Sequence, residues 1–435
     1  MKKLGFLLII LSLTIIFSAC PPLLEDYVGG ASGDLITFDD QFDLDVYKWF
    51  EILDKIAKDG KFVSLDLSKG TYKEGNEKDG GGGLSKLSFE GVDYIAFDPF
   101  PASSSGKDFI ISITLPTAAQ IIKFVKEEDE LIDLNDKDIE EAKKYSAFRA
   151  FKNLRSVKAD NVTYIGNFAF ADCTALNEIN FPRVSHTVTD AEIQNTTPHS
   201  ADIGKYAFLG CTGLKKIKFN TANVIGEYAF KGCSSLAEID FPEVWKIEKN
   251  AFEDCKSLVN VFFEKATKIG NEAFKNCINL EKAEFNAAPD RFTGTGDPFT
   301  PFSPTLPDDL PTPPAVPVFD SVIFYPSVFT GCKTLKTLNV RRAWNVYFYE
   351  KVFADTSSSI EIYLFDEPDD PGKKSFGHPQ NNKFLGEGVN ATIKEVTIIF
   401  PSNGELIENL VPNTIFKFLR KYYTNVDAIP RKRAL

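Results

Sequence analysis

The chain has 435 residues and carries 49 Lys and Arg against 61 Asp and Glu, a formal net charge of −12 at pH 7. This balance argues against a nucleic-acid-binding protein, because nucleic-acid phosphates would repel such a surface. Beyond the first segment of the chain, no apolar run approaches the roughly 18 residues of a membrane-spanning helix.

Residues 1–19 have the pattern of a secretory signal peptide. Two lysines precede an apolar run from Leu4 to Phe17, and two small residues precede Cys20. The run is too short for a spanning helix. The segment resembles a bacterial lipobox, which implies that Cys20 is acylated and becomes the mature N-terminus. Phe17 departs from that motif, where Leu is usual, so ordinary cleavage beside an incidental Cys20 stays open.

Residues 20–40 are predicted to be a tether, and residues 41–108 an N-terminal capping region. The cap is predicted to begin with an amphipathic helix that Gly60 ends. The apolar residues of this helix fall at helical spacing: Val46, Trp49, Phe50, Leu53 and Ile56. A strand is predicted over 62–68, and the glycine-rich stretch 79–85, DGGGGLS, is predicted to be a flexible loop.

Six Ala-Phe pairs follow between residues 147 and 274, with gaps of 22, 38, 22, 22 and 22 residues. In five of these units a Cys lies three residues after the Phe, and a Leu lies three residues after the Cys. These cysteines, with the Cys of one later copy, are Cys173, Cys211, Cys233, Cys255, Cys277 and Cys332. Repetition at this period indicates stacked units, since one unit alone cannot bury its apolar face.

Within one unit, residues 236–241, LAEIDF, are predicted to form a short half-buried strand, and residues 248–255, EKNAFEDC, a single helical or 3₁₀ turn. The Ile…Ala-Phe…Cys-x-x-Leu pattern resembles the leucine-rich repeats of the BspA-like, or Treponema pallidum type, family. The resemblance covers residues 146–285, and residues 329–353 more weakly. It implies a leucine-rich-repeat solenoid of short parallel β-strands, and a surface protein that adheres to host matrix proteins or to other cells.

The repeats are predicted over residues 109–285, with an acidic insert at 126–145. Residues 286–320 are predicted to be a Pro-rich insertion without periodicity, and residues 321–400 to be degenerate C-terminal repeats. Residues 401–435 are predicted to contain a closing helix, as the C-terminal cap, and a basic tail.

The Cys row is predicted to be a buried, reduced ladder that packs as Leu does. Disulfides between neighbouring turns stay open in an exported protein, whereas a zinc site lacks the C-x-x-C spacing it would need. The three histidines, His186, His199 and His378, accompany no nucleophile motif. We therefore expect no enzyme, cofactor, metal or small-molecule substrate. A polysaccharide-cleaving β-helix would need three strands per turn in place of the one predicted here.

The outward side chains of the predicted strands mix both charge signs around one exposed aromatic residue, Phe262, with Trp245 in the preceding turn. An exposed aromatic beside charges is typical of an interface anchor. The candidate binding face comprises Lys216, Lys218, Glu238, Asp240, Trp245, Phe262, Lys282 and Glu284. The predicted function is a lipid-anchored bacterial surface protein that binds a host matrix or plasma protein. The alternative is a periplasmic or envelope scaffold, and the Pro-rich insertion is a second candidate contact site.

Overall fold

The computed structural model describes residues 34–74, 83–89, 92–99, 105–122, 147–148, 151–184, 202–286, 321–340, 345–348, 351–357, 359–364, 375–376 and 395–399. The chain divides into two compact units, residues 1–184 with 211–214 and residues 185–210 with 215–435. The predicted signal peptide with Cys20, the acidic insert, residues 287–320 and the C-terminal cap lie outside the described residues.

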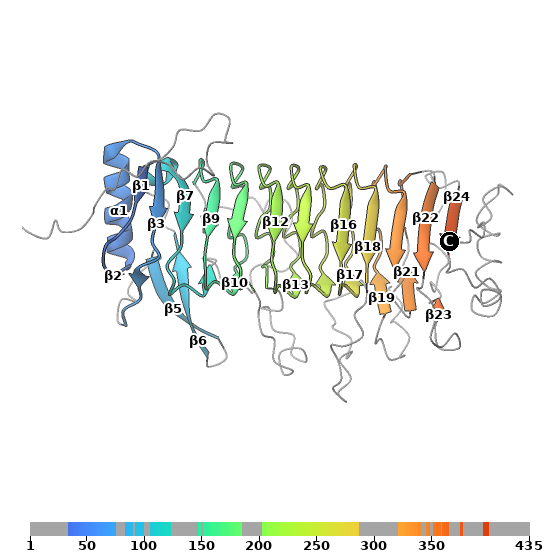
Figure 1. Ribbon diagram of the computed structural model, residues 1–435, viewed down its shortest axis with the longest axis horizontal. Coiled ribbons are helices and arrows are strands. Elements are labelled where there is room, and N and C mark those ends of the chain that lie inside the picture. The colour runs from blue at the N-terminus through green and yellow to red at the C-terminus, as the bar shows by residue number, and fades with distance from the viewer. Residues whose placement is uncertain are drawn as a thin grey trace, which may run out of the picture. The chain divides into compact units, whose positions relative to one another are not determined.

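The first unit is a stack of parallel turns, each of which adds one strand to a common sheet (Figure 1). This sheet runs in the order β1 (Asp34–Ile36), β3 (Val63–Asp66), β7 (Ile110–Thr114), β9 (Ser156–Lys158) and β11 (Glu178–Asn180). A second sheet has the order β10 (Tyr164–Ile165), β8 (Ile121–Ile122), β6 (Val92–Asp98) and β5 (Gly83–Phe89), and β2 (Phe42–Asp43) pairs with β4 (Gly70–Thr71). Strand β1 lies within the predicted tether, so the fold includes residues from Asp34 onward.

The predicted amphipathic helix is present as α1 (Val46–Asp59), packed on the 3₁₀ helix η2 (Ser105–Phe109) and on β5. The side chain of Asp45 accepts a hydrogen bond from the Lys48 backbone N–H at 2.8 Å and caps the N-terminus. Gly60, in the left-handed conformation, ends the helix. The buried residues of α1 are Trp49, Ile52, Leu53 and Ile56. The helix therefore covers the first turns of this unit with one apolar face (Figure 1).

The glycine-rich stretch 79–85 is not a loop throughout, because its last residues begin β5, which pairs with β6 as an antiparallel hairpin. Gly83 has φ +80°, and a Cβ on it would lie 2.5 Å from the carbonyl oxygen of Leu44. Only glycine fits this close approach of two backbones. The loop prediction is therefore wrong for residues 83–85, while residues 79–82 lie outside the described part of the chain.

The second unit is also a stack of parallel turns, with two short strands in most turns. One row contains the pair β12 (Lys216–Lys218) and β14 (Glu238–Asp240), and the sheet β16 (Asn260–Phe263), β18 (Lys282–Phe285), β20 (Thr337–Val340), β22 (Ser359–Leu364) and β24 (Glu395–Ile399). The other row is β13 (Val224–Ile225), β15 (Lys246–Ile247), β17 (Lys268–Ile269), β19 (Ser321–Phe324), β21 (Asn345–Phe348) and β23 (Ser375–Phe376). Because β17 pairs with β19 and β18 with β20, the repeat resumes in register after the Pro-rich insertion.

The Ala-Phe segment, predicted as a single helical or 3₁₀ turn, is a series of tight turns. Each is closed by a hydrogen bond between residues three apart, such as Ala229 N–H to the Gly226 carbonyl oxygen at 3.2 Å and Lys231 N–H to that of Tyr228 at 3.1 Å. The backbone N–H groups of Tyr228, Phe230 and Gly232 donate to carbonyl oxygens of the next turn of the stack, at 2.8–2.9 Å. Tyr228 and Gly232 both have positive φ, 57° and 76°, which turns these donors along the stack. Besides the two rows of strands, the Ala-Phe segment therefore forms a third line of hydrogen bonds between neighbouring turns. The sequence predicted one strand per turn, so the second strand present in most turns was not predicted.

Two columns of stacked phenylalanines fill the core of the second unit. The Ala-Phe rings stack from turn to turn at centroid distances of 5.1–5.8 Å, through Phe208, Phe230, Phe252, Phe274, Phe329 and Phe353. The second column stacks at 5.6–6.1 Å, through Phe219, Phe241, Phe263 and Phe285. The rings of the second column therefore face the Ala-Phe rings across the core. Burial of the apolar surface of both columns stabilises the stacking of neighbouring turns.

Candidate functional site

Seven of the eight predicted binding-face residues lie on one row of strands, β12, β14, β16 and β18. Lys216 and Lys218 lie in register with Glu238 and Asp240, and the two pairs form ion pairs of 2.8 and 2.6 Å between neighbouring turns. These four side chains are exposed, so their ion pairs contribute little to stability. They can exchange their partners for charges on another molecule at small cost.

Phe262 is the exposed aromatic residue of this face, with 50% of its surface accessible. It lies in register with Glu284 of β18, and β14, which carries Asp240, contacts β16 on the other side. Glu284 also forms an ion pair of 3.0 Å with Lys282. Both strands beside Phe262 therefore carry a carboxylate residue, and that of Glu284 lies in register with it.

Trp245 lies apart from the other residues of the predicted face. It directly precedes β15, in the second row of strands, and accepts backbone hydrogen bonds there from Thr267 and Lys268. Its ring packs under the ammonium group of Lys268, with Nζ 5.7 Å from the ring centroid. Trp245 therefore does not extend the Phe262 face. The sequence missed this because a strand of two residues leaves no alternation to detect.

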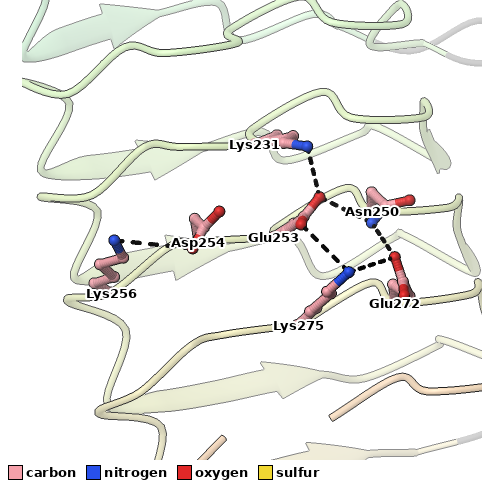
Figure 2. A network of polar contacts seen from close by, with 7 residues as sticks. All are labelled: Lys231, Asn250, Glu253, Asp254, Lys256, Glu272 and Lys275. Atoms are coloured by element: carbon pink, nitrogen blue, oxygen red, sulfur yellow. Dashed lines mark hydrogen bonds and ion pairs between the residues drawn. The ribbon is translucent and has the colours of Figure 1, made fainter. Parts of the chain in front are cut away.

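A network of charged side chains that the sequence analysis missed covers the outer side of the Ala-Phe turns (Figure 2). Glu253 has only 9% of its side chain exposed and lies between Lys231, at 2.9 Å, and Lys275, at 3.8 Å, from the turns before and after it. Asn250 Nδ2 donates to Glu253 and to Glu272, both at 2.9 Å. The network thus links three consecutive turns.

The pKa values of two members follow from these contacts. Burial raises the pKa of Glu272, but hydrogen bonds from Asn250 and Lys275 outweigh it and hold the pKa below its usual value. Burial likewise lowers the pKa of Lys275, but its hydrogen bond to Glu272 outweighs this and raises the pKa. Both groups are therefore charged at neutral pH, which suits a structural network and not proton transfer.

Replacing Glu253 with alanine is expected to lower the free energy of unfolding by about 2 kcal/mol, because two ammonium groups and the Asn250 amide lose a nearly buried acceptor. Urea unfolding of the full chain measures the change. The matched control is Glu238→Ala, which breaks an ion pair with 67% of each side chain exposed and should leave stability unchanged. Equal losses in the two variants would contradict a stabilising role for the network.

The six cysteines of the repeat are buried and free in the structure. Each Sγ–H donates to the carbonyl oxygen of an Ala-Phe phenylalanine in the preceding turn, at 3.0–3.6 Å. Burial is the main cause that raises the pKa of Cys173, Cys255, Cys277 and Cys332. A neutral, unreactive thiol suits packing, and it suits neither metal binding nor nucleophilic chemistry.

Residues 140–198 and 185–293 match the model of the BspA type leucine-rich repeat region, in six copies. The chain carries BspA-type leucine-rich repeats. The match spans the Ala-Phe turns and the Cys row of residues 173–277, so the stacked turns described above are leucine-rich repeats. No curated protein matches this chain.

Several solved structures share the leucine-rich repeat type. A Treponema pallidum leucine-rich repeat protein is 20% identical, with 62% of this chain and 86% of that chain covered and a TM-score of 0.32. A leucine-rich repeat protein from Bacteroides ovatus is 16% identical over 73% of this chain and 71% of that one, with a TM-score of 0.33. A leucine-rich cell surface protein from Faecalibacterium prausnitzii is 16% identical over 82% and 98%, with a TM-score of 0.30. Sequence identities and TM-scores this low give no information about a shared ligand.

The histidines named above lie outside the described residues. Within the described part of the chain, no three His, Cys, Asp or Glu side chains gather as metal ligands would. No helix among the same residues is both long enough and apolar enough to cross a membrane.

Proposed function

We propose that the protein is exported, attached to the bacterial envelope through acylated Cys20, and binds a protein partner through the strand face centred on Phe262. Its role at the cell surface is adhesion to host matrix proteins or to other cells. The signal-like residues 1–19 and the lipobox-like Ser18-Ala19-Cys20 support the export and the anchor. Two or more acyl chains suffice for stable anchoring.

The observation that carries the binding proposal is the half-exposed ring of Phe262 on a rigid strand. Val259 on the same turn is 41% exposed, and Ile278 on the next turn is 37% exposed. Most large apolar side chains of these turns are buried, so the exposed ring of Phe262 is the apolar anchor of the face, with the paired charges of β12, β14 and β18 on the same row of strands. Interface hot spots have this arrangement, an aromatic anchor within a polar rim.

The charges around Phe262 indicate the chemistry of the partner. Glu284 lies in register with Phe262, the strand on the other side carries Asp240, and the whole chain has a net charge of −12. An arginine or lysine of a partner would stack on the ring and replace Lys218 in the exposed ion pair of Asp240. The proposal therefore favours a partner with basic residues at its contact surface, which the net charge would also attract over a distance.

Proteinase K added to intact cells tests the location. Loss of the repeat region from antibody detection, while a periplasmic control protein survives, is the expected result for a surface protein. Full protection would contradict the adhesin proposal and favour the alternative, a periplasmic or envelope scaffold.

Replacing Phe262 with alanine is expected to weaken binding to a matrix protein at least about tenfold, because the anchor at the centre of the face is lost. The measurement is surface plasmon resonance of the full chain against a panel of purified matrix and plasma proteins. The matched control is Tyr47→Ala, which removes a 79% exposed aromatic from α1 in the first unit. Equal affinity of the wild type and the Phe262 variant for every panel member that binds would place the contact elsewhere.

A further inference from the structure

The network around Glu253 brings a lysine amine and an asparagine amide to one carboxylate oxygen (Figure 2). Glu253 Oε2 lies 2.9 Å from Lys231 Nζ and accepts a hydrogen bond of the same length from Asn250 Nδ2. The two nitrogen atoms are therefore at most twice that distance apart. Lys231 belongs to the turn before that of Asn250 and Glu253, so the amine and the amide meet across the boundary between two neighbouring turns.

The amide of Asn250 is buried and held in one orientation. Only 2% of the residue is exposed, and Nδ2 donates a second hydrogen bond to Glu272, also at 2.9 Å. Its carbonyl oxygen Oδ1 is buried and has no hydrogen-bond partner among the described residues. A buried polar atom without a partner is costly and rare in native proteins, and it marks a site of strain or of chemistry. The amide is therefore fixed beside the lysine with its carbonyl group unpaired.

Of the two lysines that contact Glu253, Lys231 is the better placed to react. Burial opposes it, but the hydrogen bond to Glu272 raises the pKa of Lys275 and keeps that residue an ammonium group, 3.8 Å from Glu253. Lys231 Nζ lies closer to Glu253, and 5.3 Å from the ring centroid of Tyr228. Transfer of a proton from Lys231 to the nearly buried Glu253 leaves two neutral groups, which removes the desolvation cost of an ion pair.

We propose that Lys231 and Asn250 react with each other and become joined by an amide bond between the two turns. Glu253 first accepts a proton from Lys231 Nζ, and the neutral amine attacks Cγ of Asn250. As the Nζ–Cγ bond forms and the Cγ–Nδ2 bond breaks, Glu253 gives its proton to Nδ2 and takes a second one from Nζ. The products are the amide bond and one ammonium ion, and the Glu253 carboxylate is restored.

The fold supplies the rate of this reaction and gains a cross-link from it. Groups held in contact react as if at effective molarities of roughly 10⁵ M or more, and a positioned carboxylate carries the protons. The new bond closes a loop from Lys231 to Asn250, which constrains the unfolded chain as a disulfide does. The loss of stability expected for Glu253→Ala is that of the unlinked network, and loss of the bond would add to it. The cross-link is independent of what the Phe262 face binds.

Peptide mapping of the full chain tests the proposal. The protein is denatured, reduced and digested with trypsin, which does not cleave after a lysine whose amine is acylated. The expected product is a branched peptide of residues 219–246 joined to residues 250–256, lighter than the two parts together by one ammonia molecule. Fragmentation should place the branch between Lys231 and Asn250. Separate peptides 219–231 and 250–256, with no branched product, would overturn the proposal.

Variants test the role of each group. Lys231→Met and Asn250→Gly should give no branched peptide, and glycine fits the positive φ of 55° at Asn250. Glu253→Gln keeps the size of the side chain but cannot carry the protons, so the linked fraction of freshly made chain should fall at least about tenfold. The matched control is Lys216→Met, which removes a lysine from an exposed ion pair and should link as the wild type does. Equal linkage in Glu253→Gln, or a branch at Lys275 in place of Lys231, would contradict these roles.

Discussion

Replacing Phe252 with alanine is expected to lower the free energy of unfolding by about 4 kcal/mol, the largest effect of a single core substitution here. The ring is fully buried and stacks on those of Phe230 and Phe274, with both centroid distances at 5.2 Å. Phe241 and Phe263 contact it from the other column at 6.2 Å. Its loss removes four ring contacts and opens a cavity that neighbours on both sides cannot fill, because each belongs to its own turn.

Urea unfolding measures the total loss, and native-state hydrogen exchange locates it. Since each turn contacts only its neighbours, protection should fall most at the amides of the turns that carry Phe230, Phe252 and Phe274. The matched control is Phe262→Ala, which removes the same side chain from an exposed position and should change stability by less than about 0.5 kcal/mol. A similar loss in both variants would contradict the stacked core.

The 22-residue period predicts much of this fold, since equivalent residues of neighbouring copies must stack. The Ala-Phe, Cys and Leu positions are buried in both units, and the repeat resumes with Cys332 after a long insertion. The Ala-Phe turn was harder to predict. Its positive-φ residues, such as Tyr228, donate backbone hydrogen bonds to carbonyl oxygens of the next turn. Such a hydrogen bond joins two turns, so the sequence of one unit does not reveal it. The sequence of one unit shows only its apolar face, and a helical turn would have the same apolar face.

The candidate site shows the same limit. The exposure of Phe262 follows from the alternation of its strand, so it could be predicted, whereas the place of Trp245 depends on a strand of two residues. The network around Glu253 left a signal in the sequence. Lys231, Glu253 and Lys275 alternate in sign at the 22-residue period, and alignment of the copies would have found them. The burial of Glu253, which distinguishes this network from the exposed ion pairs, results from the packing of neighbouring turns, so an alignment of the copies would not show it.

Above pH 9 the protein is expected to lose stability steeply, because its Cys row must stay protonated when folded. Four buried thiols, Cys173, Cys255, Cys277 and Cys332, have pKa values raised above their ordinary value of 9.0. In the unfolded chain each ionises near that ordinary value, so the unfolded chain then binds fewer protons than the folded one. Each thiol's contribution to the free energy of unfolding is complete below pH 9 and falls by about 1.4 kcal/mol per pH unit above it. The four thiols together therefore lower the free energy of unfolding by about 5.5 kcal/mol per pH unit.

A Cys255→Ala variant isolates this contribution from lysines and tyrosines that titrate in the same range. Urea unfolding of both chains is measured between pH 7 and pH 10.5. Above pH 9, the free energy of unfolding of the wild type should fall more steeply than that of the variant, by about 1.4 kcal/mol per pH unit. This difference in slope does not depend on how much the alanine lowers the free energy of unfolding at pH 7. Thiol labelling at pH 8 is the second measurement. We expect no reaction of the Cys row in the native chain, and labelling of six thiols besides Cys20 after denaturation. Disulfides between turns would leave fewer thiols and remove the difference in slope, so the two measurements together decide between a ladder of packed thiols and a cross-linked one.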